Sequence, residues 1–382
     1  MEKTLNIIDL FCGCGGFGLG AELAGFKSFV AIDIDATLQS AYKLNFPHTR
    51  AITCDIAEMD ESAWKLILNG TEIDGIIGGP PCQGYSRMGH SDQDDPRRSL
   101  LHDYFRTVKL LQPKFFVMEN VEGLLDKKNS SELTKGIDLV REQYQVIEPM
   151  VLDASDYGIP TKRKRVIVVG YKKEFFAGLN KESFKPKISK HIKVADAISD
   201  FNEPVHPTND ENDYGWNSYK EVSKISQYAI ELRKLPPEGL GNDLFIENLK
   251  KGIISGFLAT NHTEAVSKRY QDIEQGKIDK ISKSKKLSWD GFCPTLRAGT
   301  GSDKGSYQAV RPLHPASGRV ITVREAARLQ GFPDWFGFHK TKWHSFRMIG
   351  NSVSPLFSKE ILTVIKNHYL IIDNSLQKVE GE

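Results

Sequence analysis

Short apolar segments recur along the first half of the chain and are separated by longer stretches with a helical period. Residues 5–11, 73–77 and 115–118 have the length and composition of buried strands. The apolar positions of 99–111 recur every three to four residues and stop before Pro113, which predicts a helix. Alternation of buried strands with helices predicts an α/β fold.

The first of these units has a glycine-rich turn between two strands. Its G-x-G-x-x-G spacing is formed by Gly13, Gly15 and Gly18. We expect a helix from about Leu19 to Gly25, followed by a strand over 28–32 that leads into Asp33. A strand, a glycine turn, a helix, a second strand and an acid form the layout that binds a nucleoside-bearing cofactor, with the acid on a ribose hydroxyl.

A single cysteine follows the apolar run 73–77. The segment 78–86 reads GGPPCQGYS, so its glycines and prolines end the strand and fix the backbone around Cys82. Ligands bind at the carboxyl edge of open α/β sheets, and Cys82 is therefore a candidate nucleophile. The alternative is a small buried core residue, but polar residues follow Cys82 where a core would continue.

Charged groups also stand near the predicted strand 115–118 and near a later one at 166–169. Glu119 directly follows the first, where burial would favour its protonated form and make it a candidate proton donor; the alternative is a cap of the next turn. Arg163 and Arg165 precede the second, and alternation would put both on one face, where they could hold an anion or favour a thiolate. An exposed basic strand end is the alternative.

Composition sets broad limits on function. The chain has 382 residues, 40% hydrophobic and 26% charged, with a formal net charge of +2, so local basic patches would have to hold any nucleic acid. Five cysteines, no signal peptide and no apolar run long enough to cross a bilayer favour a reducing cytoplasm. Cys12 and Cys14 have no further ligand residues at metal-binding spacing, so we expect no metal.

Six blocks of sequence resemble the DNA cytosine-5 methyltransferases, which use S-adenosylmethionine. They are DLFCGCGG (9–16), PPCQ (80–83), Glu119-Asn120-Val121, Arg163-x-Arg165, REAARLQGFP (324–333) and GNSV (350–353), in the family's order. Thr161 departs from the family, which usually has Gln there. The resemblance implies a doubly wound, Rossmann-like methyltransferase sheet with an inserted, smaller target-recognition domain.

The resemblance also implies roles for individual residues. Cys82 would add to cytosine C6, Glu119 would stabilise the ring at N3, and Arg163 and Arg165 would support the site. The target base would be flipped out of the duplex, with Gln83 and Ser86 near the opened position. The cofactor set is Phe11, Gly13, Gly15, Asp33, Asp55, Ile56, Pro80, Asn351 and Val353; a solvated loop acid remains the alternative for Asp55.

The resemblance further implies a division of the chain into a catalytic S-adenosylmethionine-binding domain (1–184), a target-recognition domain (185–343) and a C-terminal segment (344–382) that returns to the first. Thr295 and Arg297 resemble a recognition element, with Arg297 reading a guanine edge. Five lysines within 277–286 are either a solvated face or phosphate contacts. They are Lys277, Lys280, Lys283, Lys285 and Lys286.

The predicted function is therefore methylation of cytosine C5 in a short double-stranded DNA sequence. We expect a cytoplasmic monomer that belongs to a restriction-modification system, with a separate cognate endonuclease, or that acts as an orphan methylase. A tRNA cytosine-5 methyltransferase is the alternative enzyme. A dinucleotide-dependent oxidoreductase and a silent DNA-binding module fit less well, because neither gives all six blocks a role.

Overall fold

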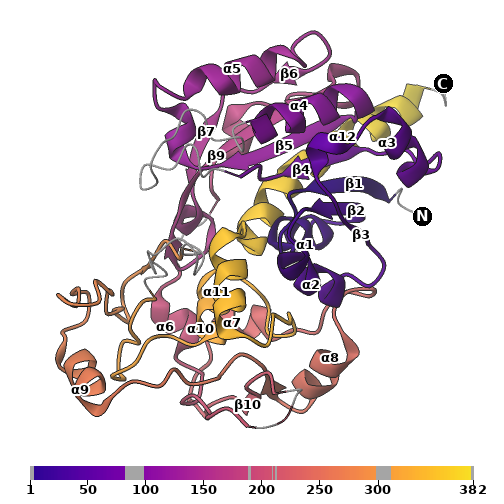
Figure 1. Cartoon of the computed structure of the whole chain (residues 1–382). Helices are drawn as coiled ribbons and strands as arrows, with labels where there is room; N and C mark the ends of the chain where they lie inside the picture. The colour runs from indigo at the N-terminus through magenta and orange to yellow at the C-terminus, as the bar shows by residue number, and fades with distance from the viewer. Residues whose placement is uncertain are drawn as a thin grey trace.

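The chain folds into two lobes, one above the other in Figure 1. This computed structural model describes residues 4–81, 99–187, 191–208, 210, 213–297 and 311–379, without the side chains of 370–379. The upper lobe contains the large sheet and is called the sheet lobe. The lower lobe consists mainly of short helices and irregular chain between residues 191 and 349.

One mixed eight-stranded sheet organises the sheet lobe. Its main order is β3-β2-β1-β4-β5-β9-β6, and β7 also pairs with β9. The bounds are β1 Leu5–Leu10, β2 Phe26–Asp33, β3 Arg50–Thr53, β4 Gly75–Gly78, β5 Phe115–Asn120, β6 Gln145–Val146, β7 Met150–Asp153 and β9 Lys164–Tyr171. Strands β1 to β5 run parallel, whereas β9 is antiparallel to β5, β6 and β7.

Helices cover both faces of this sheet, as the doubly wound prediction requires. They are α1 Gly16–Leu23, α2 Ala36–Asn45, α3 Glu61–Leu68, α4 Ser99–Leu111, α5 Ser130–Asp138 and α12 Pro355–Val379. Side chains alternate along β1: Leu5 and Ile7 pack with α1 and α12, whereas Ile8 and Leu10 pack with α3 and α4. The long helix α12 returns from the end of the chain to this sheet (Figure 1).

The structure corrects the predicted start of the first helix and the limits of two strands. Helix α1 begins at Gly16 rather than near Leu19, because Gly15 adopts a left-handed conformation with φ 95° and serves as its N-cap. Strand β2 already begins at Phe26, because Gly25, with φ 87°, turns the chain directly back into the sheet. Strand β4 begins at Gly75, later than the apolar run indicated.

The lower lobe has little regular structure. Its helices are α6 Val194–Ile198, α7 Gln227–Leu232, α8 Asp243–Lys250, α9 Glu264–Asp272, α10 Val323–Leu329 and α11 Lys342–Asn351. Two small sheets pair β10 (Asn217–Ser218) with β11 (Ile253–Ile254) and β12 (Cys293–Pro294) with β8 (Thr161–Lys162). The second pair joins the lobes, because β8 leads directly into the sheet lobe.

Buried charges organise the centre of the lower lobe. Arg328 is fully buried and donates to Asp334 at 2.7 and 2.6 Å and to Asp200 at 3.2 Å. Arg324 is also fully buried and donates to backbone carbonyls of Ser255, Pro333 and Phe336. These side chains are therefore structural parts of the lobe, and Arg324 is not available to a phosphate.

The two lobes share a hydrophobic cluster. Leu38, Tyr42 and Phe46 of α2 pack together with Phe332, Phe336 and other residues of the lower lobe. Within the described residues, no helix has both the length and the apolar character needed to cross a membrane.

Candidate active site

Several of the predicted functional residues that the structure describes lie at the carboxyl ends of four neighbouring parallel strands. In the sheet order these strands are β2, β1, β4 and β5. They end near Asp33, the glycine turn, Pro80 and Glu119 respectively. This edge is where ligands bind in open α/β sheets.

The glycine turn is tied to the acid that ends β2. Gly13 has φ 52°, and its amide donates to Asp33 Oδ2 at 2.8 Å. Asp33 Oδ1 accepts the amide of Asp35 at 2.8 Å. Burial raises the pKa of Asp33, although these two amides oppose the rise. Asp33 thus shapes the turn as well as standing at the position predicted for a ribose contact.

Two residues missed by the sequence reasoning flank Asp33. Ile34 is 68% exposed, so it presents an apolar surface directly beside the glycine turn. Arg347 of α11 forms an ion pair with Asp35, the N-cap of α2. Burial would raise the pKa of Asp35, but the Leu38 amide and the Arg347 guanidinium outweigh it and lower that pKa. The sequence signal for Ile34 is its apolar side chain directly after the predicted ribose acid. No local pattern marks Arg347.

The C-terminal GNSV block packs directly on the glycine turn. A Cβ on Gly16 would lie 1.9 Å from Ser352 Oγ and 2.3 Å from the carbonyl oxygen of Val353, so only glycine fits. Val353 is buried against Phe17, whereas Asn351 is exposed. The structure therefore brings the predicted residues 351 and 353 to the predicted cofactor turn from more than 300 positions away in the sequence.

Glu119 forms an ion pair at the end of β5. Its Oε1 lies 2.7 Å from Arg165 Nε, and the residue is only 8% exposed. A Cβ built on Gly79 would lie 3.3 Å from Oε2, which places the carboxylate beside the chain that leads to Pro80. Asn120 fixes the same chain, because its Nδ2 donates to the Pro80 carbonyl at 3.2 Å.

The two arginines of the Arg-x-Arg block contact different partners. Arg163 is buried and donates to the carbonyls of Leu296 at 3.3 Å, Gly350 at 3.2 Å and Ser352 at 2.9 Å. Arg163 thus connects the GNSV block to the chain just after β12, whereas Arg165 forms the ion pair with Glu119. These contacts differ from the prediction that both guanidiniums lie on one face and act together.

Other predicted residues have structural contacts of their own. Asp55 accepts the Ala57 amide at 2.9 Å, and Ile56 is buried, so only its main chain could face a ligand. The hydroxyl of Thr295 donates to the Lys162 carbonyl at 2.7 Å, which fixes β12 on β8, and Arg297 is exposed two residues later. Phe11 has φ 55° and is partly buried at the start of the turn.

Cys82, Gln83 and Ser86 lie outside the described residues. Pro81, directly before Cys82, is the last described residue of that segment. Of the residues predicted to act together with Cys82, the structure describes Glu119, Arg165 and Pro80.

Two further titratable groups lie beneath the glycine turn. Burial and the charge of Asp33 raise the pKa of Asp9 well above its usual value. The Gly18 amide and the Tyr42 hydroxyl approach this carboxyl without hydrogen-bond geometry. Burial also raises the pKa of Cys14 to about 12, so its thiol stays protonated. Among the described residues, no group of three or more His, Cys, Asp or Glu side chains could hold a metal ion.

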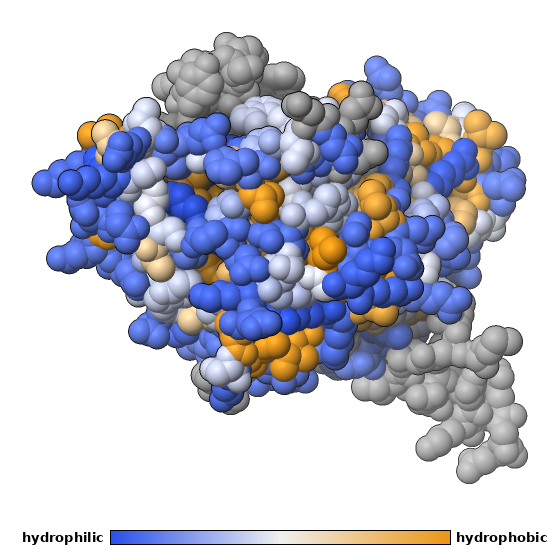
Figure 2. All heavy atoms as spheres, turned by 90° about the horizontal axis from the view of Figure 1, so that it is seen from below, coloured by the Kyte–Doolittle hydropathy of each residue, from blue (hydrophilic) through white to orange (hydrophobic). Residues whose placement is uncertain are grey.

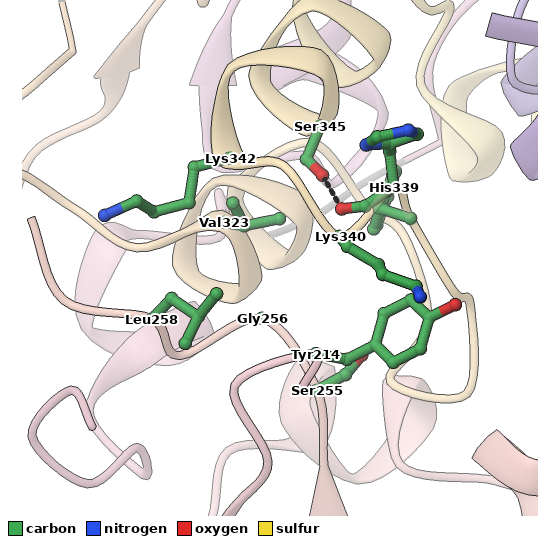
Figure 3. Close-up of a pocket in the computed structure, with 10 residues that line it drawn as sticks. Tyr214, Ser255, Gly256, Leu258, Val323, His339, Lys340, Lys342 and Ser345 are labelled. Carbon is green, nitrogen blue, oxygen red and sulfur yellow. Dashed lines mark hydrogen bonds between the residues drawn. The ribbon is translucent and has the colours of Figure 1, made fainter. Parts of the chain in front are cut away.

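A small cavity in the lower lobe is separate from this edge. It is lined by Tyr214, Leu258, Val323, Lys342 and neighbouring residues, and Figure 3 shows these side chains around it. The hydroxyl of Ser345 donates to the His339 carbonyl at its rim. None of the predicted cofactor or catalytic residues lines it.

Comparisons of sequence identify the family of the chain. Residues 5–367 match the family described as C-5 cytosine-specific DNA methylase. The chain is 41% identical over 361 residues to the type II methyltransferase M.XorII of Xanthomonas oryzae pv. oryzae, covering 93% of this chain and 82% of the relative. It is 33% identical over 399 residues to the type II methyltransferase M.DdeI of Desulfomicrobium norvegicum, covering 94% and 87%.

Solved structures share the fold. A prophage-encoded E. coli protein, described as a DNA modification methyltransferase, is 40% identical and superposes with a TM-score of 0.86, covering 96% of this chain and 99% of that one. The Dnmt2 methyltransferase of S. pombe, at 17% identity, superposes with a TM-score of 0.59 and covers 97% and 99%. The second likeness concerns the fold alone.

Proposed function

The chain belongs to the C-5 cytosine-specific DNA methylase family, and we propose that it acts on a specific short double-stranded sequence with Cys82 as its nucleophile. The family's methyl donor is S-adenosylmethionine, which supplies the methyl group as a sulfonium. The observation that supports the proposed site is the Glu119–Arg165 ion pair beside Gly79, three residues before Cys82.

The chemistry follows from the weak nucleophilicity of cytosine C5. The Cys82 thiolate adds to C6, which moves electron density onto C5 and N3. Glu119, in its protonated form, donates a hydrogen bond to N3 as negative charge develops there. C5 takes up the methyl group, a base removes the C5 proton, and the bond between the Cys82 sulfur and C6 breaks to restore the aromatic ring. A free cysteine is only a few per cent thiolate near neutral pH, so a nearby cation such as Arg165 favours the reactive form.

The residues around the glycine turn fit the methyl donor. Gly13 and Gly15 keep side chains out of the turn, Asp33 offers carboxylate oxygens to a ribose, and exposed Ile34 offers an apolar face to a purine ring. Phe11, Asp55, the main chain of Ile56, Pro80, Asn351 and Val353 complete the proposed cofactor set. The exposed side chain of Ile34 supports the fit of these residues to S-adenosylmethionine, because contact with the purine ring would remove apolar surface from water.

Arg163 has a positioning role in this proposal. Its three backbone contacts hold the GNSV block and the chain before Arg297 at fixed positions relative to β9. Gln83, Ser86, Thr295 and Arg297 are the proposed DNA contacts, and Thr295 contributes through its main chain because its hydroxyl is already engaged. Residues 185–343 form the proposed recognition domain, between the catalytic parts 1–184 and 344–382.

We further propose that the chain is the modification enzyme of a type II restriction-modification system. Two relatives that align over most of their length carry the name type II methyltransferase. It would act as a monomer, because one flipped cytosine needs one site, and a cognate endonuclease would be a separate protein.

Methyl transfer tests this function directly. The purified chain is incubated with S-adenosylmethionine labelled in the methyl group and with either unmethylated plasmid DNA or tRNA. Label on DNA is the expected result, and bisulfite sequencing of that DNA then identifies the target site. Label on tRNA alone, or tight DNA binding without transfer, would contradict the proposal.

A further inference from the structure

A basic loop, residues 279–284, follows α9 in the lower lobe. Its main chain is closed by two hydrogen bonds, from the Lys283 amide to the Asp279 carbonyl at 2.9 Å and from the Asp279 amide to the Ser284 carbonyl at 2.8 Å. The buried Asp279 carboxylate accepts the Ser282 amide at 2.7 Å and lies 3.2 Å from Arg269. This loop, residues 279–284, is therefore held from within.

The five lysines of this region differ in exposure, with Lys285 intermediate between the others. Lys286 is buried and donates to the carbonyls of Tyr270 and Gln271 at 3.0 and 2.9 Å, so it anchors the loop to α9. Lys277, Lys280 and Lys283 are exposed, and none forms an ion pair with any described residue. The exposed lysines therefore leave a local excess of positive charge.

Two exposed isoleucines lie among these lysines. Ile281 is 71% exposed within the loop, and Ile278 is 59% exposed beside it. The lower lobe seen from below is mainly hydrophilic with scattered apolar patches (Figure 2). Exposure of large apolar side chains to water is unfavourable. Here they lie among cations, so a suitable partner is anionic and has apolar surface in its grooves.

A short segment with a turn at residues 288–291 connects the loop to β12. Leu287 and Lys285 pair with Leu313, and the chain then reaches β12, which pairs with β8 just before Arg163. Ser284 and Cys293 are nine positions apart, so the chain between them spans at most about 30 Å. Figure 1 shows α9 on the same side of the molecule as β7 and β9.

We propose that loop 279–284 is a DNA-contacting element, in which Lys280 and Lys283 bind phosphates and Ile281 packs into the groove between them. The proposal rests on the DNA function above and adds a contact in the lower lobe to those proposed at Thr295 and Arg297. Phosphate contacts carry no sequence information, so the lysines contribute affinity and Ile281 contributes shape fit.

The lysine contribution is measurable as a salt dependence. The affinity of the full chain for a fluorescent 30-base-pair duplex carrying the target site is measured over a series of NaCl concentrations. The double variant Lys280→Ala/Lys283→Ala should weaken binding and reduce the slope of log K against log salt by about 2, since each phosphate contributes about 0.9. The matched control, Lys250→Ala/Lys251→Ala, removes the same charge from α8 and should keep the wild-type slope.

Ile281→Ser should weaken binding roughly tenfold without changing the salt slope, because it removes apolar contact only. Unchanged melting temperatures are expected, since all three side chains are exposed. A wild-type slope in the lysine double variant, or an equal loss in the α8 control, would overturn the loop proposal while wild-type methylation of DNA persisted. Absence of any wild-type methyl transfer to DNA would instead overturn the underlying function.

Discussion

The two lobes use charge in opposite ways. In the sheet lobe, apolar strands form the core, and Asp33 and Glu119 lie at strand ends, on the edge where ligands bind. In the lower lobe, Arg324, Arg328 and Asp334 are buried at its centre and bond to one another or to backbone carbonyls.

This difference predicts which property each substitution affects. Removal of a charge at the sheet edge should reduce catalysis with little loss of stability, because the strands do not depend on it. Removal of a buried charge in the lower lobe should reduce stability first, because its partners are then left buried without compensation.

The largest effect is expected at the sheet edge. Glu119→Gln should lower kcat roughly 10²- to 10⁴-fold, since the amide cannot give a proton to the ring nitrogen. The fold should be retained by circular dichroism, and the loss in thermal melting should be smaller than for Arg328→Leu, because Arg165 is partly exposed whereas Asp334 is fully buried. Glu148→Gln, at an exposed carboxylate paired with Lys181, is the matched control and should keep wild-type kcat. Equal kcat in Glu119→Gln and wild type would remove Glu119 from the chemistry.

The converse test lies in the lower lobe. Arg328→Leu should reduce the free energy of unfolding by about 3–5 kcal/mol, because Asp334 and Asp200 lose their buried partner. Urea denaturation measures this loss. Arg141→Ala, which breaks an exposed pair with Asp138, should cost less than about 1 kcal/mol. A similar small loss for Arg328→Leu would mean that the buried network is not what stabilises the lobe.

Asp9 is an exception within the sheet lobe, because it is a buried carboxyl. Its folded pKa is raised, chiefly by burial, so the folded state binds its proton more tightly than the unfolded state does. Stability is therefore full below the unfolded value of about 3.9 and is lost as pH rises toward the folded pKa. Asp9→Asn has no proton to lose. Its melting temperature relative to wild type should rise with pH across this window, by less than the Arg328→Leu effect, and a pH-independent difference would refute the assignment.

The smallest effect is expected where the lobes meet the cofactor edge. Arg347→Ala removes the ion pair to Asp35 and should loosen the turn that holds Asp33 and Ile34. The pair is partly exposed, so we expect a loss of about 1 kcal/mol, or roughly fivefold weaker S-adenosylmethionine binding by calorimetry, with kcat retained at saturation. Arg347→Lys should recover part of the affinity. A fall in kcat with unchanged affinity would be inconsistent with this positioning role.

Sequence patterns predicted the sheet lobe well because its signals are local. Helix α4 has the predicted limits, and the glycine turn, Glu119 and the GNSV block meet at the predicted edge. Patterns failed in the lower lobe, because Arg324, Arg328 and Lys286 look like surface residues until distant carbonyls and carboxylates surround them. The backbone contacts of Arg163 likewise lie more than 130 positions away in the sequence.

The central claim is that the Cys82 sulfur bonds to the target cytosine, and a trapped complex tests it most directly. DNA whose target cytosine is replaced by 5-fluorocytosine has no removable C5 proton, so the reaction should stop after methyl transfer. We predict an adduct that survives denaturing electrophoresis, requires S-adenosylmethionine, maps to Cys82 by peptide mass spectrometry and is absent in Cys82→Ser. Failure to form an adduct with an otherwise active enzyme, or attachment at another cysteine, would contradict the account.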